Sequence, residues 1–483
     1  MSNNEKDSAA NSAQDTNAIY FKDATELAAL IRTKQISSRE VVQAHLDRIA
    51  VVNTKVNAIV TLLANDALKG ADAADKAVKD GAELGQLHGV PFTIKDAIDT
   101  AGVLTQRASR IFAGNVPTKD ATVVTRFKAA GAIPLAKTNL PEFSAWQETD
   151  NLVTGLSRNP WNLDRTPGGS SGGASAAVAA GMGPLAIGTD GGGSIRIPAS
   201  FAGIFGHKAS FGRIPAYPAS AAWSLSHIGP MTRTVTDAAL MMNVCAGPDS
   251  RDQFSLPAER VDYVKALKGS LKGLRIAWVP DPGYAKLVDP EVTAVCARAA
   301  KRFRELGCRV EEVNPKWPLP KQPWKAIFCG GIATRLAPFL PERRADIDAG
   351  LASLIDETMS WGPTTYVQAW FDRMAWWEHP RRLFETYDLM LSPTVACPPF
   401  KVGLDNPSEI AGRPADSYEW IPYTYPFNMT GQPACSVPAG FTADKLPVGL
   451  QIVGRRFDDV TVLRAAHAFE KAQPWAHLTP PID

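Results

Sequence analysis

The 483-residue chain contains two glycine- and serine-rich segments, Thr166-Pro-Gly-Gly-Ser-Ser-Gly-Gly-Ala-Ser175 and Leu185-Ala-Ile-Gly-Thr-Asp-Gly-Gly-Gly-Ser-Ile-Arg196. Between them, residues 174–180 have the small-residue composition of a closely packed helix that ends at Gly181. Residues 185–189 are apolar and predict a buried strand. One loop therefore precedes a helix and the other follows a strand. Such a helix-turn-strand unit can bring two loops together.

The rest of the chain alternates between strand-like and helix-like patterns. Apolar runs predict strands near residues 90–95, 133–136, 185–189, 274–279, 389–391, 435–438 and 448–453. Helical patterns cover residues 23–50, 55–80, 121–130, 290–306 and 458–472. This alternation predicts an α/β fold with a mixed, largely central β-sheet flanked by helices on both faces. We expect one domain over residues 19–483, in which a loop-rich stretch, 314–385, forms a cap.

The composition is that of an ordinary globular protein, with 45% apolar and 21% charged residues. It excludes a chain that is disordered throughout, a collagen-like repeat and a coiled coil. Lys and Arg number 51 and Asp and Glu number 49, for a formal net charge of +2. Because the sequence shows neither a basic excess nor a basic stripe, we expect no nucleic-acid partner.

Targeting and membrane signals are absent from the N-terminal residues. Residues 1–16 are polar and lack the apolar run of a signal peptide, which predicts a disordered tail over residues 1–18. The longest weakly polar run, 174–188, contains Pro184 and is too short to cross a membrane. We therefore expect a soluble, cytoplasmic protein.

The six cysteines show no metal-binding or redox spacing. No two of them form C-x-x-C, and no H-E-x-x-H motif accompanies them. We expect reduced thiols, mostly in the core, and neither a metal nor a cofactor. The cysteines are Cys245, Cys296, Cys308, Cys329, Cys397 and Cys435.

Two familiar uses of glycine-rich loops fit this sequence poorly. A phosphate-binding P-loop needs a Lys directly before Ser or Thr, and neither loop has one. Residues 168–172 match the nucleophile-elbow pattern G-x-S-x-G, but residues 159–167 are not the hydrophobic strand that should precede an elbow. The match is therefore interpreted as accidental.

The second loop is better suited to acyl-transfer chemistry. Gly191-Gly-Gly-Ser194 places unhindered backbone N–H groups beside a hydroxyl, as in an oxyanion hole next to a nucleophile. Ser194 still needs a base. The spacing alone leaves His207 and His227 open, and a relay through Ser170 and Lys95 is the alternative.

Further motifs accompany the two loops, and with them the sequence resembles the amidase signature family. The resemblance covers most of the chain and is weakest between about residues 314 and 420. It implies the amidase signature fold, with a catalytic core at about residues 85–250. The matching text is Leu87-His-Gly-Val-Pro-Phe-Thr-Ile-Lys95-Asp, Lys137-Thr-Asn-Leu-Pro-Glu, Arg158-Asn-Pro-Trp-Asn, residues 166–212, Ile228-Gly-Pro-Met-Thr-Arg and Pro447-Val-Gly-Leu-Gln-Ile-Val-Gly.

The resemblance also implies a catalytic triad. Ser194 is the implied nucleophile, Ser170 the bridging serine after a cis peptide, and Lys95 the base. Burial removes solvation from a lysine and lowers its pKa, so a buried Lys95 can act as a base near neutral pH. A hydroxyl both donates and accepts, so Ser170 can relay the proton.

The remaining loop residues have implied roles around this triad. Asp190 and Arg196 flank the turn with opposite charges, which suits a pair that holds the loop. Ser171 is expected to support the first loop. The implied oxyanion-hole donors are backbone N–H groups of the turn that ends at Ser194, namely those of Gly191, Gly192 and Gly193.

One branch of the family is the glutamine-hydrolysing subunit of a tRNA-dependent amidotransferase. Its members carry an acid three residues before the Thr of a Thr-x-Pro-x-Asn stretch, to hold the glutamine amino group. Here the stretch is Thr424-Tyr-Pro-Phe-Asn428, and the corresponding residue is Ile421. An apolar residue cannot hold an ammonium group, so a stand-alone amidase is favoured, with carbamates or esters as further substrates. A catalytically silent scaffold and the amidotransferase subunit remain the alternatives.

Six of the twelve tryptophans fall within residues 317–377. Their rings suit the binding of apolar groups. They equally suit the core of a helical cap, with Trp370, Met374 and Trp377 on one helical face. We expect a small-molecule substrate, a neutral aryl or otherwise apolar amide or carbamate, no membrane partner, and a monomer or homodimer.

Overall fold

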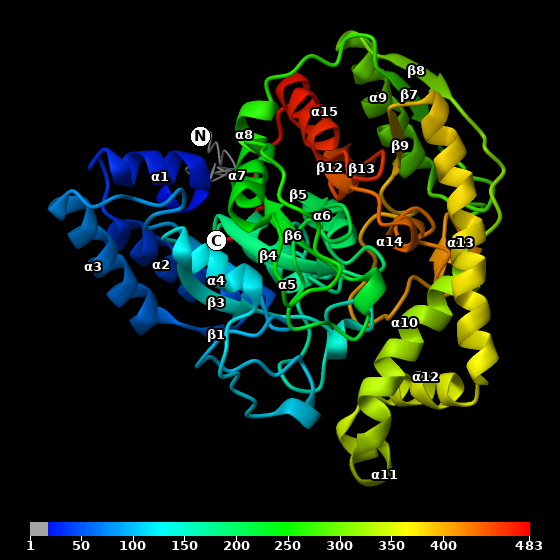
Figure 1. Cartoon of the computed structure of the whole chain (residues 1–483), viewed down its shortest axis with the longest axis horizontal. Helices are drawn as coiled ribbons and strands as arrows, with labels where there is room; N and C mark the ends of the chain where they lie inside the picture. The colour runs from blue at the N-terminus through cyan, green and yellow to red at the C-terminus, as the bar shows by residue number, and fades with distance from the viewer. Residues whose placement is uncertain (1–17) are drawn as a thin grey trace, which may run out of the picture.

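The structure is a computed structural model that describes residues 18–483. Residues 1–17, which hold nearly all of the expected tail at 1–18, lie outside the described residues. The main element is a sheet of eleven strands (Figure 1). In spatial order these are β1 (Ile59–Leu62), β3 (Ile133–Thr138), β2 (Pro91–Lys95), β4 (Leu185–Asp190), β6 (His227–Thr232), β5 (Phe205–Lys208), β12 (Ala434–Phe441), β13 (Pro447–Gly454), β9 (Leu389–Pro393), β7 (Arg275–Trp278) and β8 (Arg309–Glu312).

The sheet is mixed, as predicted. Strands β3, β2 and β4 run parallel to one another, and so do β9, β7 and β8. The strands between these groups pair antiparallel, from β4 through β6, β5, β12 and β13 to β9. A separate hairpin is formed by β10 (Glu409–Ile410) and β11 (Arg413–Pro414).

Helices cover both faces of the sheet, which confirms the predicted fold class. Successive side chains of a strand point to opposite faces. In β4, Ile187 packs into the larger core cluster, to which α7 (Val235–Cys245), α9 (Pro290–Glu305) and α15 (Asp459–Ala472) contribute. Its neighbour Ala186 packs with residues of α5 (Gly172–Ala179) and α6 (Arg196–Ala202).

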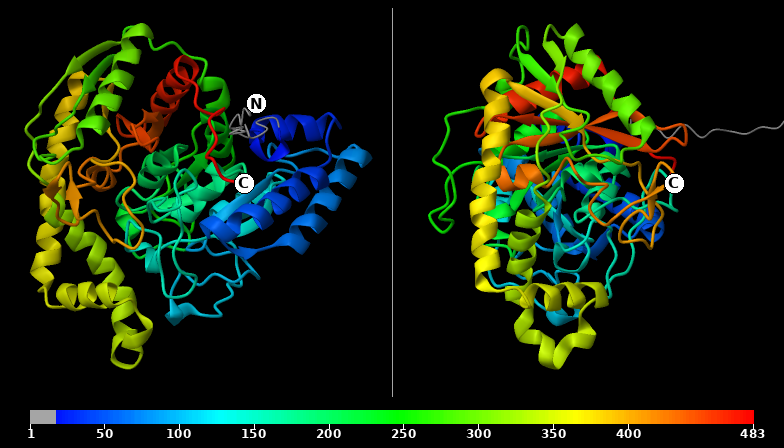
Figure 2. Two further views of the ribbon diagram at one scale, coloured as in Figure 1. Left: turned by 180° about the vertical axis from the view of Figure 1, so that it is seen from behind. Right: turned by 90° about the vertical axis from the view of Figure 1, so that its right-hand side faces the viewer.

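The remaining helices lie at the two sides of this layered core (Figure 1). At one side are α1 (Ala24–Arg32), α2 (Ser38–Val56), α3 (Ala64–Asp80) and α4 (Thr122–Ala129). At the other side are α10 (Lys321–Leu336), α11 (Leu340–Arg343), α12 (Ala349–Met359) and α13 (Pro363–Thr386), drawn in yellow (Figure 2). The short helices α8 (Tyr263–Ala266) and α14 (Pro426–Thr430) lie within connecting segments.

A side-chain cap marks the start of α2, but none marks the start of α3. The Ser37 hydroxyl accepts a hydrogen bond from the Glu40 N–H, and the Glu40 carboxylate accepts one from the Ser37 N–H. This capping box fixes the helix start. The helix predicted over residues 55–80 is in fact the end of α2, then strand β1, then α3. Strands β5, β6 and β8 were also missed, because short strands with Gly, His or charged residues lack a clear apolar run.

The expectation of a loop-rich stretch over residues 314–385 is wrong, because this segment forms α10 to α13. The predicted apolar face of Trp370, Met374 and Trp377 is wrong as well. Met374 is 59% exposed, and α13 instead buries Ala369 and Trp376 against the apolar cluster that it shares with α10. The rings at Trp370 and Trp377 are only half buried.

All six cysteines are free and buried, as expected for core thiols. Among the helices of residues 18–483, none combines the length and the apolar character that a bilayer span requires.

Candidate active site

Lys95 lies at the end of strand β2 and is completely buried. Its Nζ donates hydrogen bonds to Ser170 Oγ at 2.7 Å and to Thr189 Oγ1 at 2.9 Å. Strand β2 runs parallel to β4, so the carboxyl ends of both strands lie at the same edge of the sheet. Burial lowers the pKa of Lys95 well below its usual value, and the negative charge of Asp190 opposes this shift without cancelling it.

The two glycine- and serine-rich loops meet at this edge, as the sequence predicts. The peptide bond between Gly169 and Ser170 is cis. The next residue, Ser171, donates its N–H to the Ser194 carbonyl at 3.2 Å and its hydroxyl to the Thr189 carbonyl at 3.2 Å. Ser171 therefore ties the first loop to both the strand end and the second loop.

The turn from Gly191 to Ser194 has a backbone that only glycine fits at its third position. Gly193 has a φ of +134°, and a Cβ there would lie 2.6 Å from Thr424 Oγ1. Its N–H donates to the Asp190 carboxylate at 2.7 Å. Within residues 18–483, no acceptor takes the N–H groups of Gly191, Gly192 or Ser194. The sequence-based expectation that Gly193 is a free oxyanion donor therefore needs correction, because the Asp190 carboxylate already holds its N–H.

Asp190 and Arg196 form a fully buried ion pair behind this turn. Two hydrogen bonds of 3.0 Å join the guanidinium to the carboxylate. Burial alone would raise the pKa of the Asp190 carboxyl, but the charge and hydrogen bonds of Arg196 hold it well below its usual range. A buried pair is stable only when its remaining donors and acceptors are also satisfied.

Three residues that the sequence analysis did not assign to the site satisfy this pair. Arg196 donates to the Thr424 carbonyl at 2.9 Å, to Asn428 Oδ1 at 2.7 Å and to Gln451 Oε1 at 2.7 Å. Asn428 also donates to the Asp190 carboxylate at 2.8 Å. Two of them, Thr424 and Asn428, belong to the Thr-x-Pro-x-Asn stretch. From this stretch the sequence predicted a role only for the position of Ile421.

A cavity of about 590 Å³ opens in front of the turn, and Ser170, Thr189, Gly191 and Ser194 lie in its wall. Ser194 is 8% exposed, and within the described chain its hydroxyl has no hydrogen-bond partner. The aromatic part of the wall consists of Phe112, Phe143, Phe328 and Phe339. The charged residues of the wall are Arg107 and Arg335, and none of its residues in the described chain carries a carboxylate.

Comparison with known proteins shows which family the chain belongs to. A family model described as Amidase matches residues 40–463. The chain belongs to the amidase signature family. It is 40% identical over 467 residues to an acylamidase from Rhodococcus erythropolis, an alignment that covers 96% of this chain and 98% of the relative. Membership confirms the family and the enzyme class expected from the sequence, a hydrolase that acts on amides.

Other members of the amidase signature family match at similar levels. A glutamyl-tRNA(Gln) amidotransferase subunit from Moorella thermoacetica is 40% identical over 492 residues, with 96% of this chain and 99% of that protein covered. The crystal structure of a bacterial aryl acylamidase superposes with a TM-score of 0.89 at 34% identity, covering 95% of this chain and 97% of that one. Overall identity therefore does not separate the two kinds of relative.

The tryptophans of residues 317–377 do not line the cavity of this amidase. Trp317, Trp324 and Trp376 are buried in the apolar cluster of α10 to α13. Trp324 nevertheless supports the turn from Gly191 to Ser194, because its indole N–H donates to the Gly191 carbonyl at 3.1 Å. It also stacks on Phe328, with ring centroids 5.0 Å apart. The structure thus favours the cap-core interpretation for these three rings.

Neither histidine that the spacing left open contacts Ser194. His207 Nε2 lies 3.3 Å from Asp459 Oδ1, and His227 Nδ1 lies 2.8 Å from the Leu225 carbonyl. Neither one lies in the wall of the cavity. Lys95 is therefore the candidate base that the geometry brings closest to the serines.

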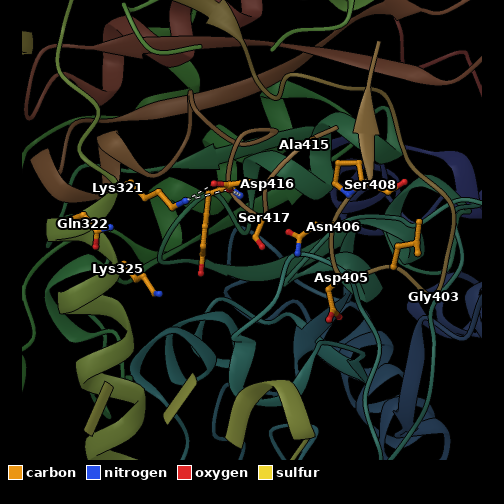
Figure 3. Close-up of a pocket in the computed structure, with 13 residues that line it drawn as sticks. Lys321, Gln322, Lys325, Gly403, Asp405, Asn406, Ser408, Ala415, Asp416 and Ser417 are labelled. Atoms are coloured by element: carbon orange, nitrogen blue, oxygen red, sulfur yellow. Dashed lines mark hydrogen bonds and ion pairs between the residues drawn. The ribbon is translucent and has the colours of Figure 1, made fainter. Parts of the chain in front are cut away.

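A second cavity, of about 670 Å³, is polar and contains none of the three candidate catalytic residues (Figure 3). Its lysines are already paired, Lys321 with Asp416 at 2.9 Å and Lys325 with Glu357 at 2.7 Å. Within the described part of the chain, no group of three or more His, Cys, Asp and Glu side chains could hold a metal ion.

Proposed function

We propose that the chain hydrolyses amides through an acyl-enzyme formed on Ser194. The observation that carries this proposal is the hydrogen bond from buried Lys95 to Ser170, beside a serine whose free hydroxyl faces the cavity. Neutral Lys95 takes a proton from Ser170, which takes one from Ser194. Ser194 Oγ then bonds to the carbonyl carbon.

The negative charge that develops on the carbonyl oxygen needs donors that are fixed in advance. The N–H groups of Gly191, Gly192 and Ser194 are without an acceptor in residues 18–483, so we assign this role to them. Gly193 has a different role, because its N–H and the Asp190 carboxylate hold the turn in shape.

Collapse of the intermediate breaks the C–N bond. The proton held by Lys95 returns through Ser170 to the leaving nitrogen, which departs as a neutral amine. Water then attacks the ester of Ser194, and the same two residues accept its proton. The ester bond breaks, the proton passes to Ser194 Oγ, and the carboxylic acid is released.

We propose a neutral aryl or otherwise apolar amide as the substrate, with aryl carbamates as a second class. Four phenylalanines supply apolar faces in the cavity wall, and the wall offers no carboxylate to an ammonium group. Ile421, at the position of the acid in amidotransferase subunits, is completely buried and apolar. Helix α10 contributes Phe328 and Ile332 to the wall, which supports the cap role proposed for residues 314–385.

The same observations argue against glutamine as the substrate. In the cavity wall, Arg107 is already paired with Asp99 at 2.7 Å, and Arg335 supplies a positive charge that would repel a glutamine amino group. The relatives named acylamidase and aryl acylamidase support the apolar amide, and the amidotransferase relatives keep glutamine as the alternative.

The deciding experiment compares kcat/KM for acetanilide, a phenyl carbamate and glutamine on the purified chain. We expect acetanilide or the carbamate to be hydrolysed faster than glutamine. Faster release of ammonia from glutamine would overturn the substrate assignment and restore the amidotransferase function. Failure to hydrolyse any of these and a wider set of amides, with the chain folded, would favour the silent scaffold.

A further inference from the structure

A third cavity, of about 520 Å³, adjoins the cavity that contains Ser194. The two cavities share the residues between them, which are Ala219, Ser220, Ala221, Thr334 and Arg335. Ala219, Ser220 and Ala221 have small side chains, so the part of the partition that they form is little more than backbone. The third cavity is therefore a neighbour of the reaction site, unlike the polar cavity of Figure 3.

Glycine in helix α10 allows the partition to be this thin. A Cβ on Gly331 would lie only 2.0 Å from the Ala221 carbonyl oxygen. A larger residue there would push the segment around Ala221 away from α10. The close approach of this segment to the helix thus places the two cavities side by side.

The wall of the third cavity is mostly apolar and aromatic. It includes Trp223, Met359, Trp361 and Tyr366, together with small residues of α10. Trp361 is the tryptophan of residues 317–377 that does reach a cavity beside the active site. Broad apolar faces of this kind bind an aromatic ring or a branched alkyl group.

The junction between the cavities has a different character. Arg335 is the charged residue that both cavities share. It is exposed, and within residues 18–483 its guanidinium makes no ion pair or hydrogen bond. A group that passes this point is favoured when it is neutral or carries an acceptor oxygen, and disfavoured when it is cationic.

We propose that the third cavity binds the remote apolar group of an elongated amide substrate. This inference rests on the proposed function, which places the scissile amide at Ser194. The substrate then has two parts: an amide in the first cavity, and an aryl or branched alkyl group joined to it by an uncharged or anionic linker that passes Thr334 and Arg335.

The test is a series of amides with a terminal phenyl group on linkers of increasing length. One arm carries the phenyl group on the acyl half of an anilide, and the other on the amine half of an acetamide. We expect kcat/KM in one arm to rise by about tenfold or more over acetanilide once the linker reaches the third cavity. A flat response to linker length in both arms would overturn the proposal.

Two substitutions test whether the gain in kcat/KM with linker length arises in the third cavity. Trp361→Ala and, on a more exposed residue, Met359→Ala should each remove most of the gain while leaving acetanilide hydrolysis unchanged. Phe371→Ala is the matched control, because Phe371 is a 57% exposed aromatic residue of α13 in the wall of neither cavity. A gain that survives both cavity variants would place the phenyl group elsewhere.

The outcome separates this inference from the proposed function. If acetanilide is hydrolysed but linker length does not change kcat/KM, the proposal for the third cavity is refuted and the proposed function is retained. If no amide is hydrolysed, the proposed function is refuted. Calorimetric titration with the longest phenyl amide still tests whether the third cavity binds the phenyl group. Equal affinities in the unaltered chain and Trp361→Ala would then refute it, and weaker binding by the variant would support it.

Discussion

Lys95 Nζ lies 2.7 Å from Ser170 Oγ, and both side chains are completely buried. Ser170 and Ser194 both lie in the wall of the cavity, whereas Lys95 does not, and Ser194, at 8% exposure, is the least buried of the three. A proton from substrate or water must therefore pass through the serines to reach the lysine. This arrangement keeps the base desolvated, which is the condition for a neutral amine near neutral pH.

Removal of the base tests this relationship directly. We expect Lys95→Ala to lower kcat/KM by several orders of magnitude, on the order of 10⁴ or more, because the triad acts as a unit. The pH profile of the unaltered enzyme should rise with pH through the folded pKa of Lys95, since the neutral form is active. Near-normal activity of Lys95→Ala, with a large loss in His207→Ala or His227→Ala, would assign the base to a histidine.

The burial of Lys95 also predicts how the free energy of unfolding depends on pH. The pKa of Lys95 is far below 10.5 in the folded chain and returns toward that value on unfolding. The unfolded chain therefore binds more protons between these two values, and the free energy of unfolding should rise with pH in that window. Lys95→Met should flatten this rise in pH-dependent denaturant titrations. An unchanged slope would show that Lys95 is charged in the folded chain.

Substitution of Ser194 and of Ser170 should have different effects on formation of the acyl-enzyme. Ser194→Ala should be inactive and folded, and it should form no acyl-enzyme with an activated ester, as measured by mass spectrometry. Ser170→Ala should slow acylation strongly while a slow mass increase on Ser194 persists. Active Ser194→Ala with inactive Ser170→Ala would instead support a nucleophile elbow at residues 168–172.

The buried pair behind the turn should contribute mainly to stability. Asp190→Asn leaves Arg196 charged and buried without its partner, so we expect the free energy of unfolding to fall by about 3–5 kcal/mol. Activity should fall too, because the Gly193 N–H loses its carboxylate. The matched control is Asp356→Asn, which breaks the exposed pair with Arg344 and should leave the unfolding midpoint unchanged. Equal effects in the two variants would contradict this role.

Trp324 of α10 offers a test of whether this helix supports the turn from Gly191 to Ser194. Trp324→Phe removes the hydrogen bond to the Gly191 carbonyl and keeps a ring against Phe328, so kcat should fall by about three- to tenfold with little change in KM. Trp376→Phe removes a similar bond, to the Pro318 carbonyl, away from the turn. That control should keep its kcat. A matching loss in both variants would show that the effect is general destabilisation.

Local sequence patterns predicted the elements of the core well. Apolar runs predicted β2 and β4, and the small residues of 174–180 predicted most of α5. Each of these signals lies within a few neighbouring residues, where backbone geometry and burial act directly. The pattern failed over residues 314–385, because contacts with α10, rather than periodicity along α13, decide which residues of α13 are buried.

The sequence by itself determined the α/β class, the two loops and the candidate residues Lys95, Ser170 and Ser194. The tertiary structure decided what those residues contact. Gly193 is held by Asp190, Arg196 donates to Asn428 from a segment 232 positions away, and the aromatic residues in the wall of the cavity beside Ser194 are phenylalanines rather than tryptophans. Hydrogen bonds and cavity walls join segments that are distant in the chain, and only the packed fold fixes which of them meet.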